Sequence, residues 1–196
     1  MNGIIIINKP KGLTSNDVVQ RVRKIYGIKQ AGHCGTLDPL AIGVLPIMVG
    51  QATKISKYLV EHNKTYIATI KLGEKTETGD YEGKIIETKN IETYTKKQVQ
   101  SILNSFIGET MQIPPMYSAI KVNGKKLYEY AREGTKIDIE PRKIIIYEIE
   151  LISYNADEIK YKVKCSKGTY IRTLCEDIAE KLGTVRIHER FGKNKC

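Results

Sequence analysis

The segment from residue 31 to residue 46 constrains the fold more than any other part of this 196-residue chain. It contains three glycines and two prolines, yet most of its other residues are apolar. Surface loops are usually polar, and glycine and proline interrupt regular structure. We therefore expect an irregular loop that is packed into the fold, with regular elements around it as a scaffold.

The rest of the chain predicts short strands and helices in irregular alternation. Short apolar or alternating runs predict strands at 4–7, 66–72, 144–152 and 159–165. Helices are predicted from capping boxes at Thr14 and Thr95 and from an apolar stripe over 170–182. This order favours an α+β fold, with a mixed or antiparallel sheet flanked by helices and loops, over a doubly wound parallel sheet. The length fits one domain.

The chain is strongly basic. Its 32 lysine and arginine residues outnumber its 22 aspartate and glutamate residues, which gives a formal net charge of +10. A charge of this size favours a polyanionic partner such as a nucleic acid. The alternative is a lysine-rich surface that is only solvated, and charge alone does not separate the two.

Several classes of protein are disfavoured. No apolar run reaches the roughly 18–20 residues that cross a bilayer, and the N-terminus lacks the pattern of a secretory leader. The cysteines and histidines fit neither a zinc site nor a disulfide framework: Cys34, Cys165, Cys175, Cys196, His33, His62 and His188. We expect a cytoplasmic chain with free thiols, no membrane association and no metal site.

Asp38 is the most informative single residue. It lies between Leu37 and Pro39 in the apolar loop, where an ionised carboxylate loses solvation unless it caps a turn or pairs with a cation. An Asp-Pro pair often starts a turn, so a structural role is one interpretation. The alternative is a functional carboxylate, because Gly35 and Gly43 on either side allow a ligand to approach the backbone closely.

Three further residues each have two possible roles, one structural and one functional. Arg172 lies off the apolar stripe of its predicted helix, so it is either solvated or the cation that a carboxylate needs. Tyr66 shares a strand face with Ala68 and Ile70, so it is either a core residue or a ring that stacks on a nucleobase. His33 is either a satisfied loop histidine or part of a site.

Four segments, in this order, resemble the motifs of one known family. They are 3–15 (GIIIINKPKGLTS), 32–46 (GHCGTLDPLAIGVLP), 64–66 (KTY) and 165–174 (CSKGTYIRTL). The family is that of the bacterial tRNA pseudouridine-55 synthases, within the pseudouridine synthase superfamily. The resemblance implies the pseudouridine synthase catalytic fold over residues 1–185. It also implies an enzyme that isomerises one uridine in the T-loop of tRNA to pseudouridine, with no cofactor and no metal.

By this resemblance, Asp38 is the catalytic nucleophile, acting on a nucleotide that is flipped out of the RNA. Arg172 would keep that carboxylate ionised. Tyr66 would stack on the uracil and could remove a sugar proton, and Tyr170 would line the pocket. His33 would occupy the space that the flipped base leaves.

The resemblance also assigns supporting residues. Asp80 matches a position that contacts the substrate nucleotide, and Lys9 is grouped with the substrate-binding residues and, with Pro10, supports the catalytic loop from beneath. The segment 113–146 matches an insertion that grips the tRNA arm through phosphate contacts. The expected partner is the T-arm stem-loop, bound by a monomer that requires no protein partner.

The resemblance ends after Val185. Residues 186–196 form an atypical charged tail with almost no apolar pattern, where the family continues with an apolar strand and, in most members, a C-terminal RNA-binding domain. We expect this chain to lack that domain. We therefore expect a shortened or frame-altered end, and a sheet with an exposed edge if a core strand is missing. This keeps two alternatives open: a tRNA-binding or RNA-chaperone module with weak turnover, and a guide-RNA-dependent relative that needs accessory proteins.

Overall fold

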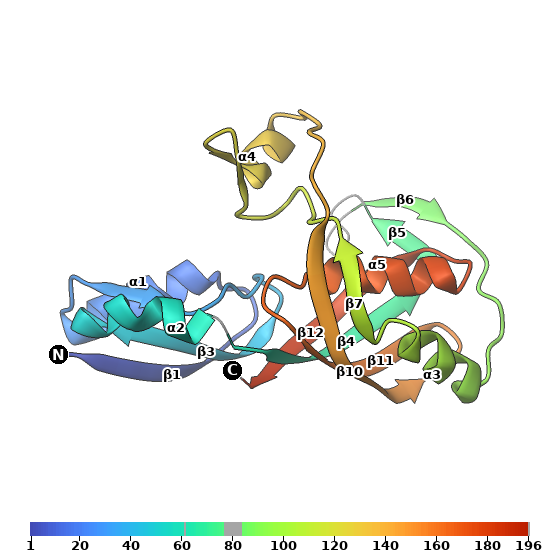
Figure 1. Cartoon of the computed structure of the whole chain (residues 1–196), viewed down its shortest axis with the longest axis horizontal. Helices are drawn as coiled ribbons and strands as arrows, with labels where there is room; N and C mark the ends of the chain where they lie inside the picture. Colours follow the sequence, from blue (N-terminus) through green and yellow to red (C-terminus); the bar gives the residue numbers. More distant parts are fainter. Residues whose placement is uncertain (61, 77–83, 196) are drawn as a thin grey trace.

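The expected α+β class is confirmed by the structure, a computed structural model that describes residues 1–60, 62–76 and 84–195. Its main element is a curved eight-stranded mixed sheet (Figure 1). Seven strands follow one another in the order β1 (Gly3–Lys9), β3 (Ile42–Val49), β12 (Arg186–Lys195), β4 (Lys64–Leu72), β11 (Glu158–Cys165), β10 (Arg142–Tyr154) and β7 (Gly108–Gln112), and β2 (Ala31–His33) pairs with β3. Only the β12–β3 pairing in this sheet is parallel.

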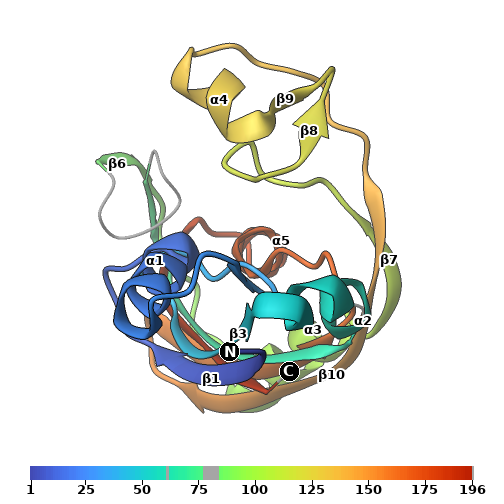
Figure 2. The same ribbon diagram turned by 90° about the vertical axis from the view of Figure 1, so that its left-hand side faces the viewer.

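Helices cover one side of the sheet. Figure 2 shows α1 (Ser15–Tyr26), α2 (Ser56–Val60) and α5 (Ile171–Lys181) above its curved floor. A short 3₁₀ helix, Gly50–Ile55, leads into α2. The capping boxes predicted at Thr14 and Thr95 are confirmed at the starts of α1 and of α3 (Lys96–Asn104). Two side chains in each box satisfy backbone N–H groups that the first helical turn leaves unpaired.

The core lies between α5 and the middle of the sheet. The predicted stripe of α5 and the predicted inward face of β4 are both buried: Ile171, Leu174, Ile178, Leu182, Tyr66, Ala68, Ile70 and Leu72. Burial of an apolar side chain of this size contributes about 1.5–3 kcal/mol. This packing fixes the first turn of α5 relative to β4, and both elements contribute to the site described below.

The segment between β7 and β10 projects away from the sheet (Figure 1). It contains the two-stranded hairpin of β8 (Lys121–Val122) and β9 (Lys125–Lys126), followed by α4 (Leu127–Arg132). We call residues 113–141 the projecting element. Asn123 and Gly124 both have left-handed backbone angles, with φ of 51° and 81°, as a two-residue hairpin turn requires. The structure therefore contains a hairpin and a short helix in succession.

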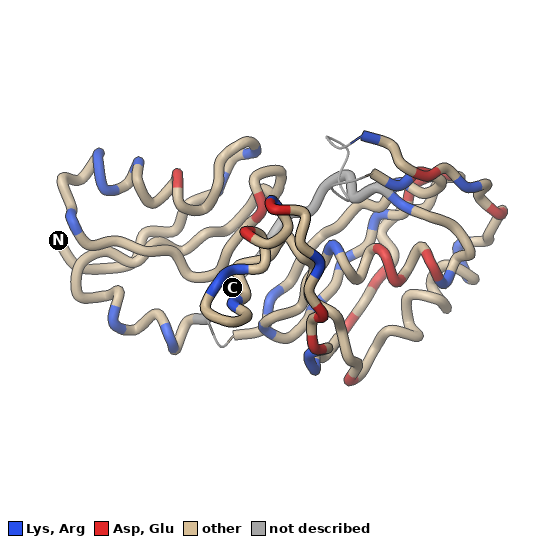
Figure 3. Tube along the Cα trace, turned by 90° about the horizontal axis from the view of Figure 1, so that it is seen from above, with Lys and Arg blue, Asp and Glu red and all other residues tan. Residues whose placement is uncertain are grey.

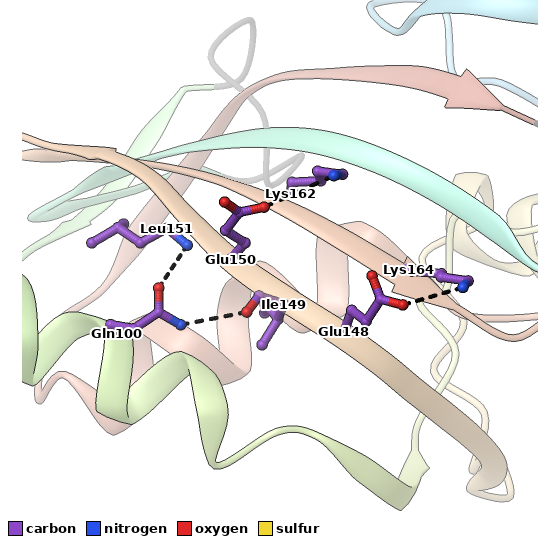
Figure 4. Close-up of polar contacts among 7 residues, drawn as sticks. All are labelled: Gln100, Glu148, Ile149, Glu150, Leu151, Lys162 and Lys164. Carbon is purple, nitrogen blue, oxygen red and sulfur yellow. Dashed lines mark hydrogen bonds and ion pairs between the residues drawn. The ribbon is translucent and has the colours of Figure 1, made fainter.

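A side-chain amide covers part of the open edge of β10. Gln100 of α3 donates to the carbonyl of Ile149 at 3.4 Å and accepts from the N–H of Leu151 at 2.8 Å (Figure 4). This pair of bonds imitates a neighbouring strand where β7 no longer pairs with β10. The opposite edge of β10 pairs with β11, where Glu150 and Lys162 form an exposed ion pair.

A second small sheet joins β5 (Glu74–Thr76) and β6 (Ile85–Thr88).

Two expectations from the sequence need correction. The whole segment 31–46 was expected as an irregular loop, but Ala31–His33 form β2 and residues 42–46 belong to β3, even though that strand contains Pro46. Pro46 lies opposite Ile6 of β1, and its carbonyl accepts from the N–H of Cys34 at 2.9 Å. Proline removes a donor from the strand, yet its carbonyl can still take part in the sheet.

The second correction concerns the charged tail. Its backbone forms β12, which lies inside the sheet between β3 and β4, so the tail supplies a strand of the sheet and does not leave an edge there. Both neighbouring strands offer backbone N–H and C=O groups. Pairing with these groups favours a strand here even though the side chains have no apolar pattern. Arg186, at its start, is only 2% exposed, donates to the carbonyl of Arg172 and pairs with Glu176 at 2.7 Å.

Over the described residues, no helix is long and apolar enough to span a bilayer.

Candidate active site

A cavity of about 440 Å³ opens between the loop of residues 34–41, β4, the start of α5 and the projecting element. Its lining combines acidic, basic and aromatic side chains: Gly35, Thr36, Asp38, Lys64, Tyr66, Tyr117, Ser118, Ala119, Tyr128, Lys167, Gly168, Thr169, Tyr170, Ile171 and Arg172. Its volume falls in the range of small-molecule sites. Segments that are far apart in the sequence therefore meet around one carboxylate.

Asp38 begins a tight turn at the edge of the cavity. Its carbonyl accepts from the N–H of Ala41 at 3.0 Å, with Pro39 in the next position of the turn. The backbone thus makes the structural turn that an Asp-Pro pair predicts, while the carboxylate remains available to the cavity. The Asp38 side chain is 36% exposed, so it is less buried than the apolar sequence around it suggested.

The loop that carries Asp38 is fixed from beneath. The N–H of Gly12 donates to the carbonyl of Pro39 at 2.8 Å. The hydroxyl of Ser15 accepts from the N–H of Leu37 at 2.8 Å and lies 3.2 Å from the carbonyl of the same residue. The turn between β1 and α1 therefore holds the backbone on both sides of the carboxylate.

Lys9 is the main support of this loop. It is fully buried, and its ammonium donates to the carbonyls of Pro10, Leu13 and Pro39 at 3.0, 2.7 and 3.2 Å. Burial lowers the pKa of the Lys9 ammonium below its usual value, and the charge of Asp38 partly opposes this shift. Lys9 lies outside the cavity lining, so the structure places it under the loop and not at the surface that a substrate would touch.

Replacing Lys9→Met should destabilise the protein by about 2–3 kcal/mol, because three buried carbonyls lose their charged donor while the side-chain length stays similar. The free energy of unfolding from urea titration measures this loss. The matched control is Lys29→Met, since Lys29 is exposed. Equal stability of the two variants would show that these three hydrogen bonds do not hold the loop.

Arg172 connects Asp38 to the projecting element. Its Nε lies 3.0 Å from Oδ2 of Asp38, and its Nη2 donates to the carbonyl of Tyr117 at 2.8 Å. The Arg172 side chain is 18% exposed, so this ion pair is less screened than a surface pair. Of the two interpretations of Arg172, the structure supports the partner of a carboxylate.

The turn before Arg172 is itself anchored. The side-chain amide of Gln112, at the end of β7, donates to the carbonyl of Tyr170 at 3.1 Å and accepts from its N–H at 2.8 Å. Gln112 is buried, with 4% of its surface exposed. This reciprocal pair fixes the start of α5, so the direction in which Arg172 leaves the helix is set by the sheet.

The remaining residues expected at the site have different placements. Tyr66 and Tyr170 line the cavity with Asp38, and Tyr66 is also buried against the core, so its two interpretations do not exclude each other. His33 lies at the end of β2, outside the cavity lining, with Nδ1 3.0 Å from the carbonyl of Gly35. Asp80 lies outside the described residues.

The sequence reasoning missed the contribution of the projecting element to the cavity. Tyr117, Ser118 and Tyr128 line the cavity but were not among the expected site residues. Pro114 and Pro115, just before Tyr117, indicated only a break in regular structure. These residues reach the cavity because of the path that the chain follows between β7 and β10. No local sequence pattern predicts that path.

Charge around the site suits an anionic ligand. Lys64 and Lys167 line the cavity beside Arg172. Figure 3 shows basic residues along the N-terminal part of the trace, with few acidic residues between them. In ranges 1–60, 62–76 and 84–195, no group of three or more His, Cys, Asp or Glu side chains could hold a metal ion.

Comparisons with known proteins find relatives over most of the chain. The model of the TruB family pseudouridylate synthase N-terminal domain matches residues 23–171. Curated proteins named tRNA pseudouridine synthase B are similar over 93% of the chain, at 53% identity in Francisella philomiragia and 50% in Vibrio atlanticus. The chain spans 61% and 57% of the lengths of these two relatives.

Solved structures show the same fold. A crystal structure of a Cbf5-Nop10-Gar1 complex contains a chain that matches 98% of this chain with a TM-score of 0.77 and 27% identity, over 48% of its own length. A structure of an H/ACA RNP bound to a substrate RNA containing 2′-deoxyuridine matches 98% of this chain with a TM-score of 0.72 and 25% identity, over 47% of its own length.

Proposed function

The chain belongs to the TruB family of pseudouridylate synthases, and from this membership we propose that it isomerises the uridine at position 55 in the T-loop of tRNA to pseudouridine. The observation that carries the proposal is the contact of Asp38 with Arg172 at the edge of a cavity lined by Tyr66 and Tyr170. A carboxylate held by a guanidinium beside aromatic rings suits a flipped nucleoside.

In the proposed reaction, the Asp38 carboxylate attacks the flipped nucleotide, either at C1′ of the ribose or on the uracil ring. The bond between N1 and C1′ breaks, the uracil rotates, and a new bond forms between C5 and C1′. The bond to Asp38 breaks in turn, which returns the free carboxylate. C5 then loses its proton and N1 gains one, so substrate and product contain the same atoms. The reaction needs no oxidant and no reductant.

The other residues of the site take supporting roles in this proposal. Tyr66 and Tyr170 line the cavity. In the proposal, Tyr66 stacks on the uracil and removes a proton from the sugar, and Tyr170 lines the pocket. Arg172 pairs with the Asp38 carboxylate and orients it. His33 fills the space left by the flipped base, Lys9 supports the loop of Asp38 from beneath, and Asp80 contacts the substrate nucleotide.

The projecting element would grip the arm of the tRNA. Its basic side chains differ in their contacts within the protein. Lys125 pairs with Glu133, and the ammonium of Lys126 lies 3.1 Å from the hydroxyl of Tyr128. Lys121 is exposed, and Arg132 stacks over the ring of Tyr128 at 5.5 Å. Such cations suit contacts with phosphates, which position an RNA without reading its bases.

Binding of the RNA should weaken as salt rises, because phosphate contacts release counterions. Lys121→Ala should lower affinity for a T-arm about threefold and reduce the slope of log affinity against log salt by about 0.7–0.9, the value for one phosphate contact. Fluorescence anisotropy at several salt concentrations measures both quantities. Lys97→Ala, on α3, is the matched control. An unchanged slope would remove Lys121 from the RNA interface.

The alternatives are less well supported. An RNA-binding module with weak turnover was favoured by an apparent missing strand, but β12 occupies that place in the sheet. A relative that needs accessory proteins fits less well, since identity is 53% to a tRNA pseudouridine synthase B and 27% to a chain solved in a Cbf5-Nop10-Gar1 complex. We also propose that the protein acts alone as a monomer in the cytoplasm, where tRNA and free thiols occur.

Incubating the purified chain with an unmodified T-arm stem-loop tests the proposal. RNA labelled with tritium at C5 of the target uridine should release its label to water, and carbodiimide mapping should place pseudouridine at that position alone. Turnover without a guide RNA or a second protein excludes the guide-dependent alternative. Binding without label release, with protein in excess over RNA, would instead identify a binding module.

A further inference from the structure

Ser118 is a buried polar residue at the catalytic cavity for which the reaction above has no role. It belongs to the projecting element, is only 6% exposed, and lines the cavity together with Asp38 and Arg172. Its hydroxyl forms no hydrogen bond with any residue that the structure describes. A buried hydroxyl without a partner destabilises a protein, and native proteins rarely leave one unpaired.

The backbone fixes where this hydroxyl lies. The N–H of Ser118 donates to the carbonyl of Met116 at 2.9 Å, and the carbonyl of Ser118 accepts from the N–H of Tyr128 at 3.2 Å. The carbonyl of the preceding residue, Tyr117, accepts from Nη2 of Arg172. Ser118 is thus held on both sides, next to the arginine that contacts the catalytic carboxylate. Its position does not depend on a hydrogen bond of the side chain.

We propose that the Ser118 hydroxyl hydrogen-bonds a polar group of the flipped uridine, and that Ser118 is therefore a further substrate-contacting residue that contributes to specificity. A serine hydroxyl both donates and accepts, so it suits a carbonyl or imino group of uracil and the 2′-hydroxyl of the ribose. The inference rests on the proposed function, since it assumes that a nucleotide enters this cavity.

Without RNA, the unpaired hydroxyl contributes nothing favourable to the fold. Ser118→Ala should therefore leave the melting temperature of the free protein unchanged or raise it. The same variant should lower kcat/KM for the T-arm about tenfold, which is the usual effect of losing one neutral hydrogen bond to a substrate. Ser118→Cys retains most of the side-chain volume and is a weak hydrogen-bonder, so it should behave like the alanine variant.

Three T-arm RNAs locate the contact: one with the target uridine, one with an abasic ribose and one with 2′-deoxyuridine at that position. Affinities are measured for the wild-type protein and for Ser118→Ala. The variant should bind the uridine RNA more weakly, and its defect should disappear with the abasic RNA if the base is contacted, or with the deoxy RNA if the sugar is contacted. Thermal unfolding of each protein is followed in parallel.

The outcomes are distinguishable. The proposal is overturned if Ser118→Ala keeps kcat/KM within twofold, if its binding defect is equal for all three RNAs, or if the free variant melts several degrees lower, which indicates a structural role. If the wild-type protein yields no product at all, the proposed function fails, while the affinities for the three RNAs still decide whether Ser118 contacts the nucleotide.

Discussion

Asp38→Asn is expected to abolish formation of pseudouridine and to leave binding of the T-arm almost unchanged. The amide keeps an oxygen that can face Arg172, and the turn that begins at Asp38 is made by backbone atoms, so the loop retains its shape. The amide lacks the negative charge that makes a carboxylate nucleophilic. Loss of a nucleophile typically lowers kcat by about 10⁴- to 10⁶-fold, so label release should fall to background.

Two measurements separate a catalytic role from a structural one. Release of tritium from C5 reports turnover, and anisotropy with the same RNA reports affinity, which should stay within about threefold because the phosphate contacts lie elsewhere. Asp157→Asn removes an exposed carboxylate from the turn between β10 and β11 and serves as the matched control. If Asp38→Asn lost affinity as severely as turnover, Asp38 would be a structural cap and not the nucleophile.

Regular elements with a local signal could be predicted from the sequence. The capping boxes placed the starts of α1 and α3, and the apolar stripe placed α5, since these patterns depend on residues three or four positions apart. The ion pair of Asp38 with Arg172 could also be predicted from the sequence, because a carboxylate in an apolar loop requires a cap or a cation. That argument identified the type of partner, and the motif resemblance identified the residue.

Features that depend on distant contacts could not be predicted. The charged sequence of β12 has no strand periodicity, and its conformation follows from hydrogen bonding to β3 and β4 on either side. β3 was not predicted for a related reason. Strand propensity disfavours Pro46, but the carbonyl of a proline can still accept a hydrogen bond in a sheet. Tyr117 and Ser118 reach the site only through the path of the projecting element.

The second prediction with a large effect concerns Arg172, whose side chain makes two contacts in different directions. Nε lies 3.0 Å from Oδ2 of Asp38, and Nη2 donates to the carbonyl of Tyr117 at 2.8 Å. A guanidinium spans both positions because its donors lie in a rigid planar fork, whereas an ammonium is a single point. A lysine at this position therefore loses one of the two contacts, although the charge is retained.

Arg172→Lys should lower kcat about 100-fold, which corresponds to the loss of one charge-assisted hydrogen bond of roughly 2–3 kcal/mol at the carboxylate. KM should change less, because phosphate contacts dominate affinity for RNA. Arg21→Lys, on the exposed face of α1, is the matched control and should retain full activity. Since the contact with Tyr117 joins the site to the projecting element, proteolysis of that element should also be faster in Arg172→Lys. Unchanged kcat in this variant would show that positive charge alone suffices beside Asp38 and that the planar geometry of the guanidinium has no catalytic role.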